Sequence, residues 1–413
     1  MGARVTRRRL LVSAGATGVG GMAIGSLAAR SSDDQSARAR GTGTVAFHGE
    51  HQAGILTPQQ DHLHFAAFDL VTGNRDDLRE LLRVWTVTAA RLTQGLPAAP
   101  TEPTSLAPPA DTGEAAGLLT SRLTVTIGLG TSLFDDRFGL RARKPGALRR
   151  LPALPGDELV ASLSDGDLCV QACADDPQVA FHAVRNLARA ARGVAVMRWS
   201  QLGFGRTSST SSAQATPRNL LGFKDGTNNI NAEDPPDQLA RHLWVGAGDG
   251  PDWMTGGSYM VTRRIRMLIE VWDRAALDDQ EATIGRQKAS GAPLGARGEH
   301  DAVDLTAMHG ATPVIAPDAH IRLAAPKTND GVRLLRRGYS FTDGFDAELG
   351  QLDAGLFFIA FQRDPHEQFV KVQQRLATDA LNEYIKHTSS GLFAVPPGIP
   401  DRPGRYLGDA LFA

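Results

Sequence analysis

The segment GDLCVQACADDPQVAFHAVRNLARAARGVAVMRWSQLGF, residues 166–204, holds a strand, a helix and a second strand in succession. In residues 166–174 the side-chain types alternate with the period of two that is typical of a strand. Residues 176–192 repeat apolar side chains with helical spacing, and the aspartates before Pro177 are placed to cap that helix. Residues 193–204 alternate again, so this segment predicts the order βαβ.

The same kind of pattern lies upstream of this segment. Residues 61–70 and 121–130 read as strands, and residues 75–92 between them have helical periodicity with an acidic start. Added to the first segment, they give the order βαββαβ. That order is typical of a ferredoxin-like unit.

The second half of the chain repeats this order. We therefore predict an α+β protein of the dimeric α+β barrel type, with two ferredoxin-like units of antiparallel strands divided near Ala215. The predicted domains are residues 46–215 and 216–413. The pattern in the second half predicts strands at 256–273, 332–342, 355–364 and 390–398, and helices at 274–290 and 365–387.

The composition indicates a globular protein with a substantial core. Of 413 residues, 42% are hydrophobic, and 44 Lys and Arg residues against 45 Asp and Glu give a formal net charge of -1. No basic stripe is present, which argues against nucleic acid as a partner. Cys169 and Cys173 are the only cysteines, and four residues along a strand separate them too far for a disulfide, so two buried thiols are predicted.

The N-terminal residues 1–45 predict an export signal followed by a polar linker. Residues 6–29 combine an Arg cluster with a Gly- and Ala-rich apolar segment. The paired arginines before Leu10 resemble a twin-arginine signal, which carries folded, cofactor-loaded proteins. An extracellular, cell-envelope or periplasmic location without a membrane span after cleavage is therefore expected. A basic disordered tail is the alternative.

Three residues far apart in the sequence have the chemistry to surround one prosthetic group. Asp225 lies in GFKDGTNN (222–229), whose composition also fits an ordinary surface turn. His320 lies in a predicted loop, where a structural histidine is the alternative to a ligand. Arg336 shares a strand face with Gly338, which leaves room beside it for something flat. A histidine on iron, with an aspartate and an arginine on the opposite side to process peroxide, would suit haem.

These motifs resemble those of the dye-decolourising (DyP-type) haem peroxidases. GFKDGTNN resembles their GxxDG signature, and HIRLAAPK followed by LRRGYSF resembles the segment with their proximal histidine and distal arginine. Residues 49–70 resemble the exported members that include deferrochelatases, and the resemblance spans nearly all of residues 47–410. It implies one haem b per chain, with His320 as iron ligand, Asp225 as distal acid/base and Arg336 as charge stabiliser.

The resemblance also implies further contacts to the cofactor. Gly226, Thr227 and Asn228 would line the haem edge. The family commonly has Asn and Arg where this chain has Ala325 and Lys327. Lys327 would therefore meet a propionate as a point charge, without the bidentate fork of arginine.

A carboxylate is expected behind the proximal histidine. Asp379 and Glu383 lie one turn apart in the helix predicted over 365–387. Either one would accept the ring N–H of His320 and raise its basicity. A solvated helix face is the alternative for both.

Together these residues predict a peroxidase that reduces hydrogen peroxide and oxidises broad one-electron donors such as dyes and phenols. Asp225 would move a proton between the peroxide oxygens while Arg336 stabilises charge on the departing oxygen. Aspartates ordinarily have a pKa near 3.9 and stay deprotonated in mild acid, so an acidic optimum is predicted.

Three other functions stay open. One is a deferrochelatase or ferrous-iron oxidase that feeds an iron-uptake permease, another is a secreted haem carrier without turnover, and the third is a haem-free module. Asp225 and Arg336 argue against the last two, since a carrier needs neither. The sequence does not fix the physiological reductant or the oligomeric state, and a homo-oligomer is compatible with it.

Overall fold

The computed structural model describes residues 43–100 and 105–413. The chain forms two repeats of strands and helices in the predicted order. The first repeat comprises β1 (His62–Leu70), α2 (Arg75–Thr93), β2 (Thr124–Gly130), β3 (Leu168–Ala174), α3 (Pro177–Ala190) and β4 (Ala195–Arg206). The second comprises β5 (Ser258–Met267), α5 (Ile269–Trp272), α6 (Leu277–Ile284), β8 (Leu335–Arg336), β9 (Tyr339–Asp346), β10 (Gln351–Gln362), α8 (Lys371–Arg375) and β11 (Ile385–Val395). Short additional elements are α4 (Pro236–His242), β6 (Met308–His309), β7 (Thr312–Pro313) and α7 (His320–Ala324).

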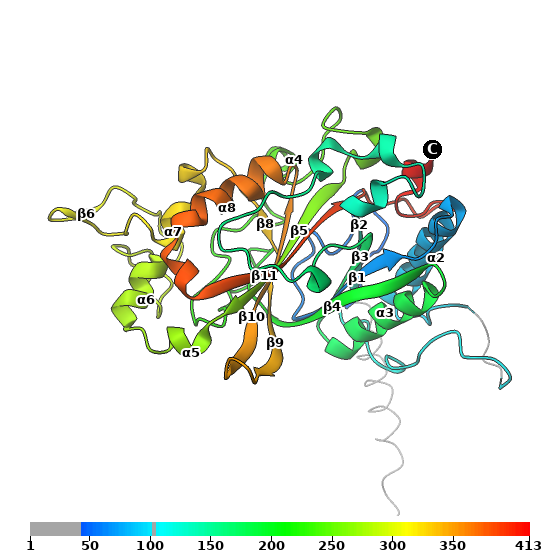
Figure 1. The fold of residues 1–413 in the computed structure, drawn as a ribbon, viewed down its shortest axis with the longest axis horizontal. Coiled ribbons are helices and arrows are strands. Elements are labelled where there is room, and N and C mark those ends of the chain that lie inside the picture. Colours follow the sequence, from blue (N-terminus) through cyan, green and yellow to red (C-terminus); the bar gives the residue numbers. More distant parts are fainter. Residues whose placement is uncertain (1–42, 101–104) are drawn as a thin grey trace, which may run out of the picture. The chain divides into compact units, whose positions relative to one another are not determined.

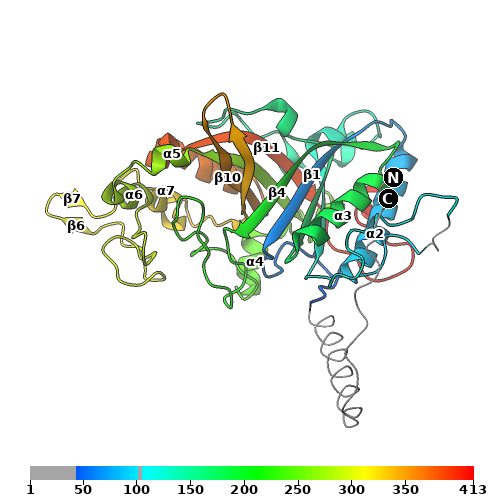
Figure 2. The ribbon, with the colours of Figure 1, turned by 90° about the horizontal axis from the view of Figure 1, so that it is seen from below.

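The strands of both repeats form one antiparallel sheet that closes on itself. The order in the described chain is β5-β11-β2-β3-β1-β4-β9-β10-β8, and β10 also pairs with β5. The two repeats join where β4 pairs with β9 and where β11 pairs with β2. Helices α2 and α3 lie beside the strands of the first repeat, and α7 and α8 beside those of the second (Figures 1 and 2). The predicted α+β barrel of two ferredoxin-like units is confirmed.

An apolar core fills the interior of the barrel. Aromatic side chains from both repeats meet there, with Phe65 and Trp199 stacked at 5.2 Å between ring centroids and Phe357 beside them. Cys169 and Cys173 belong to this core as free, fully buried thiols, as predicted. The interior is therefore packed, and a ligand must bind on the outer face of the strands.

The predicted export signal, residues 6–29, lies outside the described residues, as does nearly all of the linker that follows it. One compact unit spans Thr44–Ala413. Within residues 43–100 and 105–413, every helix is too short or too polar to cross a bilayer.

Residues 365–387 do not form the single long helix predicted from the sequence. The chain forms a π-helix over His366–Val370, continues as α8, and then makes 3-10 turns until Ile385 begins β11. Asp379 starts a new turn, because its carboxylate accepts a hydrogen bond from the backbone N–H of Leu381 at 2.9 Å. The following residues gain ladder hydrogen bonds to β5, which local periodicity cannot reveal.

Two neighbouring elements are also shorter than predicted. The strand predicted over 256–273 ends at Met267. The helix predicted over 274–290 ends at Ile284. Gly285 follows with a φ of +85°, the left-handed conformation that commonly ends helices.

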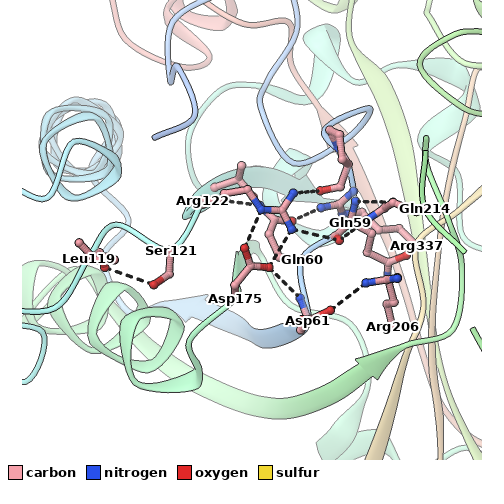
Figure 3. Close-up of polar contacts among 12 residues, drawn as sticks. Gln59, Gln60, Asp61, Leu119, Ser121, Arg122, Asp175, Arg206, Gln214 and Arg337 are labelled. Atoms are coloured by element: carbon pink, nitrogen blue, oxygen red, sulfur yellow. Dashed lines mark hydrogen bonds and ion pairs between the residues drawn. The ribbon is translucent and has the colours of Figure 1, made fainter. Parts of the chain in front are cut away.

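The single strand predicted across β8 and β9 is interrupted by a polar network (Figure 3). The Gln59 side chain donates a hydrogen bond to the carbonyl of Gly338 at 2.7 Å. The fully buried guanidinium of Arg337 donates to the side chain of Gln60. Because successive side chains on a strand point to opposite faces, this anchoring of Arg337 directs Arg336 to the other face.

His64 on β1 is expected to make the fold sensitive to acid. It is 6% exposed and stacks on Phe181 with 5.7 Å between ring centroids. Burial lowers the pKa of His64 to about 4, against about 6.5 when unfolded. The unfolded chain therefore binds more protons between these values, so the stability contribution is complete above pH 6.5 and falls towards pH 4, by about 3 kcal/mol.

Replacing His64 by leucine should remove this part of the pH dependence. The free energy of unfolding in urea at pH 4.5 and 7.5 measures it. His62→Leu, two residues away on the same strand, is the control and should keep the wild-type difference. An undiminished difference in the His64 variant would contradict the assignment.

Candidate active site

A cavity of about 610 Å³ lies between the outer face of the second-repeat strands and the helices that cover them. This volume is in the range of small-molecule sites. Apolar side chains from β5 and β10 form one wall, and apolar side chains from α7, α8 and the adjoining turns form the other. Such walls suit a large, mostly apolar group with a few polar anchors. The wall residues include Ile265, Met267, Leu356, Phe358, Ile321, Val372, Leu376 and Leu381.

Three histidines of the described chain line this cavity, His300, His320 and His387, and His320 is the one whose ring is hydrogen-bonded to a buried carboxylate. It begins α7, where a loop was predicted, and its side chain is 34% exposed towards the cavity it lines. Its Nδ1 atom lies 2.6 Å from Oδ2 of Asp379. Burial opposes protonation of the ring, but the Asp379 carboxylate outweighs it and raises the pKa of His320. The Asp379 bond occupies Nδ1, so Nε2 is the ring nitrogen that this bond leaves available to a metal.

Asp225 and Arg336 meet at another wall of the same cavity. Nη1 of Arg336 donates a hydrogen bond to Oδ1 of Asp225 at 3.0 Å. The Asn219 side chain donates to the other carboxylate oxygen at 3.3 Å. Both residues line the cavity with their side chains partly exposed, 19% for Asp225 and 29% for Arg336. The structure thus brings the predicted acid/base and the predicted arginine into direct contact.

Asn229 fixes this arrangement, a role that sequence analysis did not assign. Its side chain accepts a hydrogen bond from the backbone N–H of Arg336 and donates one to its carbonyl, both at 2.8 Å. It also donates to the carbonyl of Ser209 at 2.9 Å. One buried amide therefore ties the GFKDGTNN loop to β8. The only sequence feature that could have pointed to Asn229 is its position at the end of the GFKDGTNN motif.

Gly226 sets the course of the backbone next to Asp225. It has a φ of +87°. A Cβ atom at this position would lie 2.8 Å from the Cα atom of Ser208. Only glycine therefore fits without moving backbone. Thr227 and Asn228 follow on the cavity lining, where the sequence placed them beside the cofactor.

Replacing Gly226 by alanine is expected to destabilise the protein and to move Asp225. The left-handed conformation alone costs about 1 to 2 kcal/mol for an L-residue. The contact with the Ser208 backbone adds to that cost. Gly248→Ala is the matched control, because Gly248 has a φ of +90° and nothing in the described chain within 4 Å of its Cβ position. Urea unfolding and peroxidase assays should show the larger loss for Gly226→Ala, and equal losses would contradict the steric argument.

Several charged residues of the cavity were not singled out from the sequence. Glu299 accepts hydrogen bonds from Lys224 and, at 3.1 Å, from Thr227. Nη1 of Arg286 donates to the carbonyl of Glu299 at 3.0 Å. These residues lie near Asp225 on the cavity lining. Glu299 and Arg286 come from segments with no recognisable motif, so only the fold could identify them, whereas Lys224 lies in GFKDGTNN.

The predicted contact of Lys327 with a propionate finds no support. Its side chain is exposed, and it is not part of the cavity lining. A 3-10 turn over Pro326–Thr328 directs the chain away after α7. Arg333 does line the cavity, where its guanidinium pairs with Asp234 at 3.0 Å.

The residues present fit haem. His320, with its Nδ1 on a carboxylate, suits iron held by a porphyrin, and the described chain offers no group of three or more His, Cys, Asp or Glu side chains for a protein-only metal site. The apolar walls match the porphyrin, and the Asp225–Arg336 pair places a carboxylate and a guanidinium beside that space.

Comparison with known proteins gives consistent matches over the whole folded part. The family description "Dyp-type peroxidase, N-terminal" matches residues 52–205, and "Dyp-type peroxidase, C-terminal" matches residues 216–400. The deferrochelatase of Shigella boydii serotype 4 (strain Sb227) is 43% identical over 371 residues, covering 88% of this chain and 86% of the relative. The deferrochelatase of Escherichia coli (strain K12) is 42% identical over 371 residues, with the same coverage.

Solved structures agree with these matches. An X-ray generated oxyferrous complex of DtpA from Streptomyces lividans is 42% identical with a TM-score of 0.82, covering 91% of this chain and 99% of that one. A DyP-type peroxidase from Streptomyces coelicolor is 41% identical with a TM-score of 0.81, covering 90% and 98%. Both likenesses extend over nearly the whole of the related chains.

Proposed function

The chain belongs to the Dyp-type peroxidase family and is a haem peroxidase, and on this premise we propose that Asp225, Arg336 and His320 carry its reaction. The observation that supports these roles is that all three line one cavity. Asp225 and Arg336 are in contact at 3.0 Å there. His320 is held by a buried carboxylate at 2.6 Å.

Asp225 transfers the proton that peroxide cleavage requires. Haem held in this cavity by His320 would supply the iron that binds peroxide and the redox chemistry of its cleavage. Asp225 accepts the proton from the inner peroxide oxygen and delivers it to the outer one, which leaves as water when the O–O bond breaks. Arg336 stabilises the negative charge that develops on the departing oxygen. With two electrons from two donor molecules and two protons, one hydrogen peroxide yields two waters.

Asp379 is the positioning residue for the iron ligand. Its carboxylate accepts the Nδ1 proton of His320, fixes the tautomer and makes Nε2 a stronger donor to iron. We propose one haem b per chain in this arrangement. Pyridine haemochrome analysis of the purified protein measures both the haem type and the stoichiometry.

The peroxidase activity is expected to have an acidic optimum. A carboxylate base remains competent in mild acid, where a histidine base would be protonated. Peroxide-dependent oxidation of an anthraquinone dye or a phenol, measured from pH 3 to pH 9, tests this. Activity that peaks above about pH 8 would exclude a carboxylate as the essential base.

Release of iron from haem is the second candidate function. The relatives named deferrochelatase, at 42% to 43% identity, favour it. The two functions differ in their products, because iron release yields free iron and a metal-free porphyrin, whereas dye oxidation leaves haem intact. Iron chelation combined with porphyrin fluorescence distinguishes them. Coupling to an iron-uptake permease belongs to this candidate, and a homo-oligomer is compatible with both.

We propose export by the twin-arginine route to the cell envelope or beyond. The support is the sequence of residues 6–29 alone, with its Arg cluster and Gly- and Ala-rich segment. N-terminal sequencing of protein recovered outside the cytoplasm is expected to begin after this segment. Exported protein that still begins at Met1 would contradict the proposal.

A further inference from the structure

A second polar corner of the cavity lies at its β5–β11 end and takes no part in the proposed reaction. Arg263 of β5 and His387 of β11 both line the cavity, and they are 1% and 4% exposed. Gln373 of α8 completes the corner. The strands β11, β5, β10 and β8 are successive neighbours in the sheet, so this corner on β11 and β5 and Arg336 on β8 lie at opposite ends of one cavity wall.

Two buried atoms in this corner have no hydrogen-bond partner within residues 43–100 and 105–413. They are Nε of Arg263 and Nδ1 of His387. The other end of the guanidinium, Nη2, is paired with Asp157. A buried donor left unpaired costs about 1 to 3 kcal/mol, so native proteins rarely keep two of them side by side.

Both unpaired atoms are donors. Burial, with the Arg263 guanidinium as the second cause, lowers the pKa of His387 to about 4, so the ring is neutral near pH 7. The amide nitrogen of Gln373, as it is oriented in this structure, faces Nε2 of His387 at 3.4 Å. An amide nitrogen can only donate, so Nε2 accepts and the ring proton is on Nδ1.

We propose that Arg263 and His387 form a carboxylate-binding site at this end of the cavity. A carboxylate has two acceptor oxygens, which matches the two unpaired donors. Two sources carry this chemistry, a propionate of the bound haem or the carboxylate of a second small molecule that enters beside it. Binding of a propionate depends on the proposed haem cavity. Binding of a second small molecule requires only the corner formed by Arg263 and His387.

The corner is built independently of any ligand. The Glu158 backbone N–H donates to the carbonyl of His387 at 2.9 Å, and that of Val160 donates to Thr388 at 2.8 Å. Asp157, on the same segment, holds Arg263. Residues 157–160 of the first repeat therefore hold Arg263 and His387 in place before a ligand binds. Binding then costs less conformational entropy, because these side chains are already ordered.

Titration of apoprotein with haem b and with haem dimethyl ester tests the site. The variants are His387→Leu and the double variant Arg263→Gln with Asp157→Asn, which leaves no unpaired buried charge. Lys386→Gln, next to His387 and paired with exposed Glu158, is the matched control. Circular dichroism and urea unfolding establish that each variant is folded.

If a propionate is the ligand, both variants lose about tenfold in affinity for haem b, and neither loses affinity for the ester, which cannot present a carboxylate. If a second molecule is the ligand, haem b and the ester bind equally in all variants, and benzoate binds holoprotein about tenfold more weakly in the two variants than in wild type. Isothermal titration calorimetry measures the benzoate affinity.

Two results would contradict the inference in different ways. Wild-type affinities for haem b, ester and benzoate in both variants would show that water satisfies these donors and would overturn the site. Failure of wild-type protein to bind haem b at all would overturn the haem proposal itself. In that case benzoate titration of the same protein and its variants decides whether the corner binds carboxylates.

Discussion

Replacing Asp225 by asparagine is expected to lower kcat/KM for hydrogen peroxide by about 100- to 10,000-fold, the range for loss of a general acid–base group. Asparagine keeps the shape of the side chain and can still accept the hydrogen bond from Arg336, which is 3.0 Å long in the wild type. It cannot take up a proton. Stopped-flow mixing with peroxide measures the loss, and the Soret band is expected to show an unchanged haem content.

Asp234→Asn is the matched control for this experiment. Asp234 pairs with Arg333 at 3.0 Å, and its side chain is 17% exposed against 19% for Asp225. The variant likewise removes one carboxylate charge from a pair with a cavity-lining arginine, and kcat/KM is expected to stay within about twofold. Comparable losses in both variants would assign the effect to charge and not to proton transfer.

The elements of the first repeat could be predicted to within three residues at each boundary because their signals are local. Asp176 caps α3, its carboxylate accepting from the backbone N–H of Gln178 at 2.8 Å, and Pro177 occupies the first turn. Asn74 caps α2 in the same way.

The second repeat was harder because its elements depend on tertiary contacts. Residues 365–387 have apolar spacing compatible with one helix, yet the chain breaks at Asp379 and pairs with β5 from Ile385 onward. Strand pairing overrode the local preference. The interruption at Arg337 likewise comes from partners in the first repeat, which no local pattern contains.

The candidate site was predictable where a motif was present. Asp225, Arg336 and His320 were found from three short segments, and the structure places all three on one cavity. Lys327 was placed by its position in a motif, but the local turn directs it to solvent. The corner of Arg263 and the residues around it have no sequence signal, because their chemistry arises only from being buried together.

Replacing Asp379 by asparagine is expected to lower peroxidase kcat/KM about 10- to 100-fold, the usual effect of losing a carboxylate behind a metal-bound histidine. Asparagine keeps the shape of the side chain but has a single acceptor oxygen, so it can accept either the Nδ1–H of His320, whose bond to Asp379 is 2.6 Å long, or the backbone N–H of Leu381, and not both. It carries no charge, so Nε2 becomes a weaker donor to iron. The absorption spectrum of the ferric protein should shift together with the rate, which a merely structural role would not produce.

Glu383→Gln separates the two carboxylates that the sequence left as alternatives. In a continuous helix they would lie one turn apart and compete for His320. The chain instead breaks at Asp379, which is buried against the histidine, and Glu383 is exposed and lies outside the cavity lining. The glutamine variant should therefore keep the wild-type spectrum and a rate within about twofold. A spectral shift in this variant, with none in Asp379→Asn, would reverse the assignment.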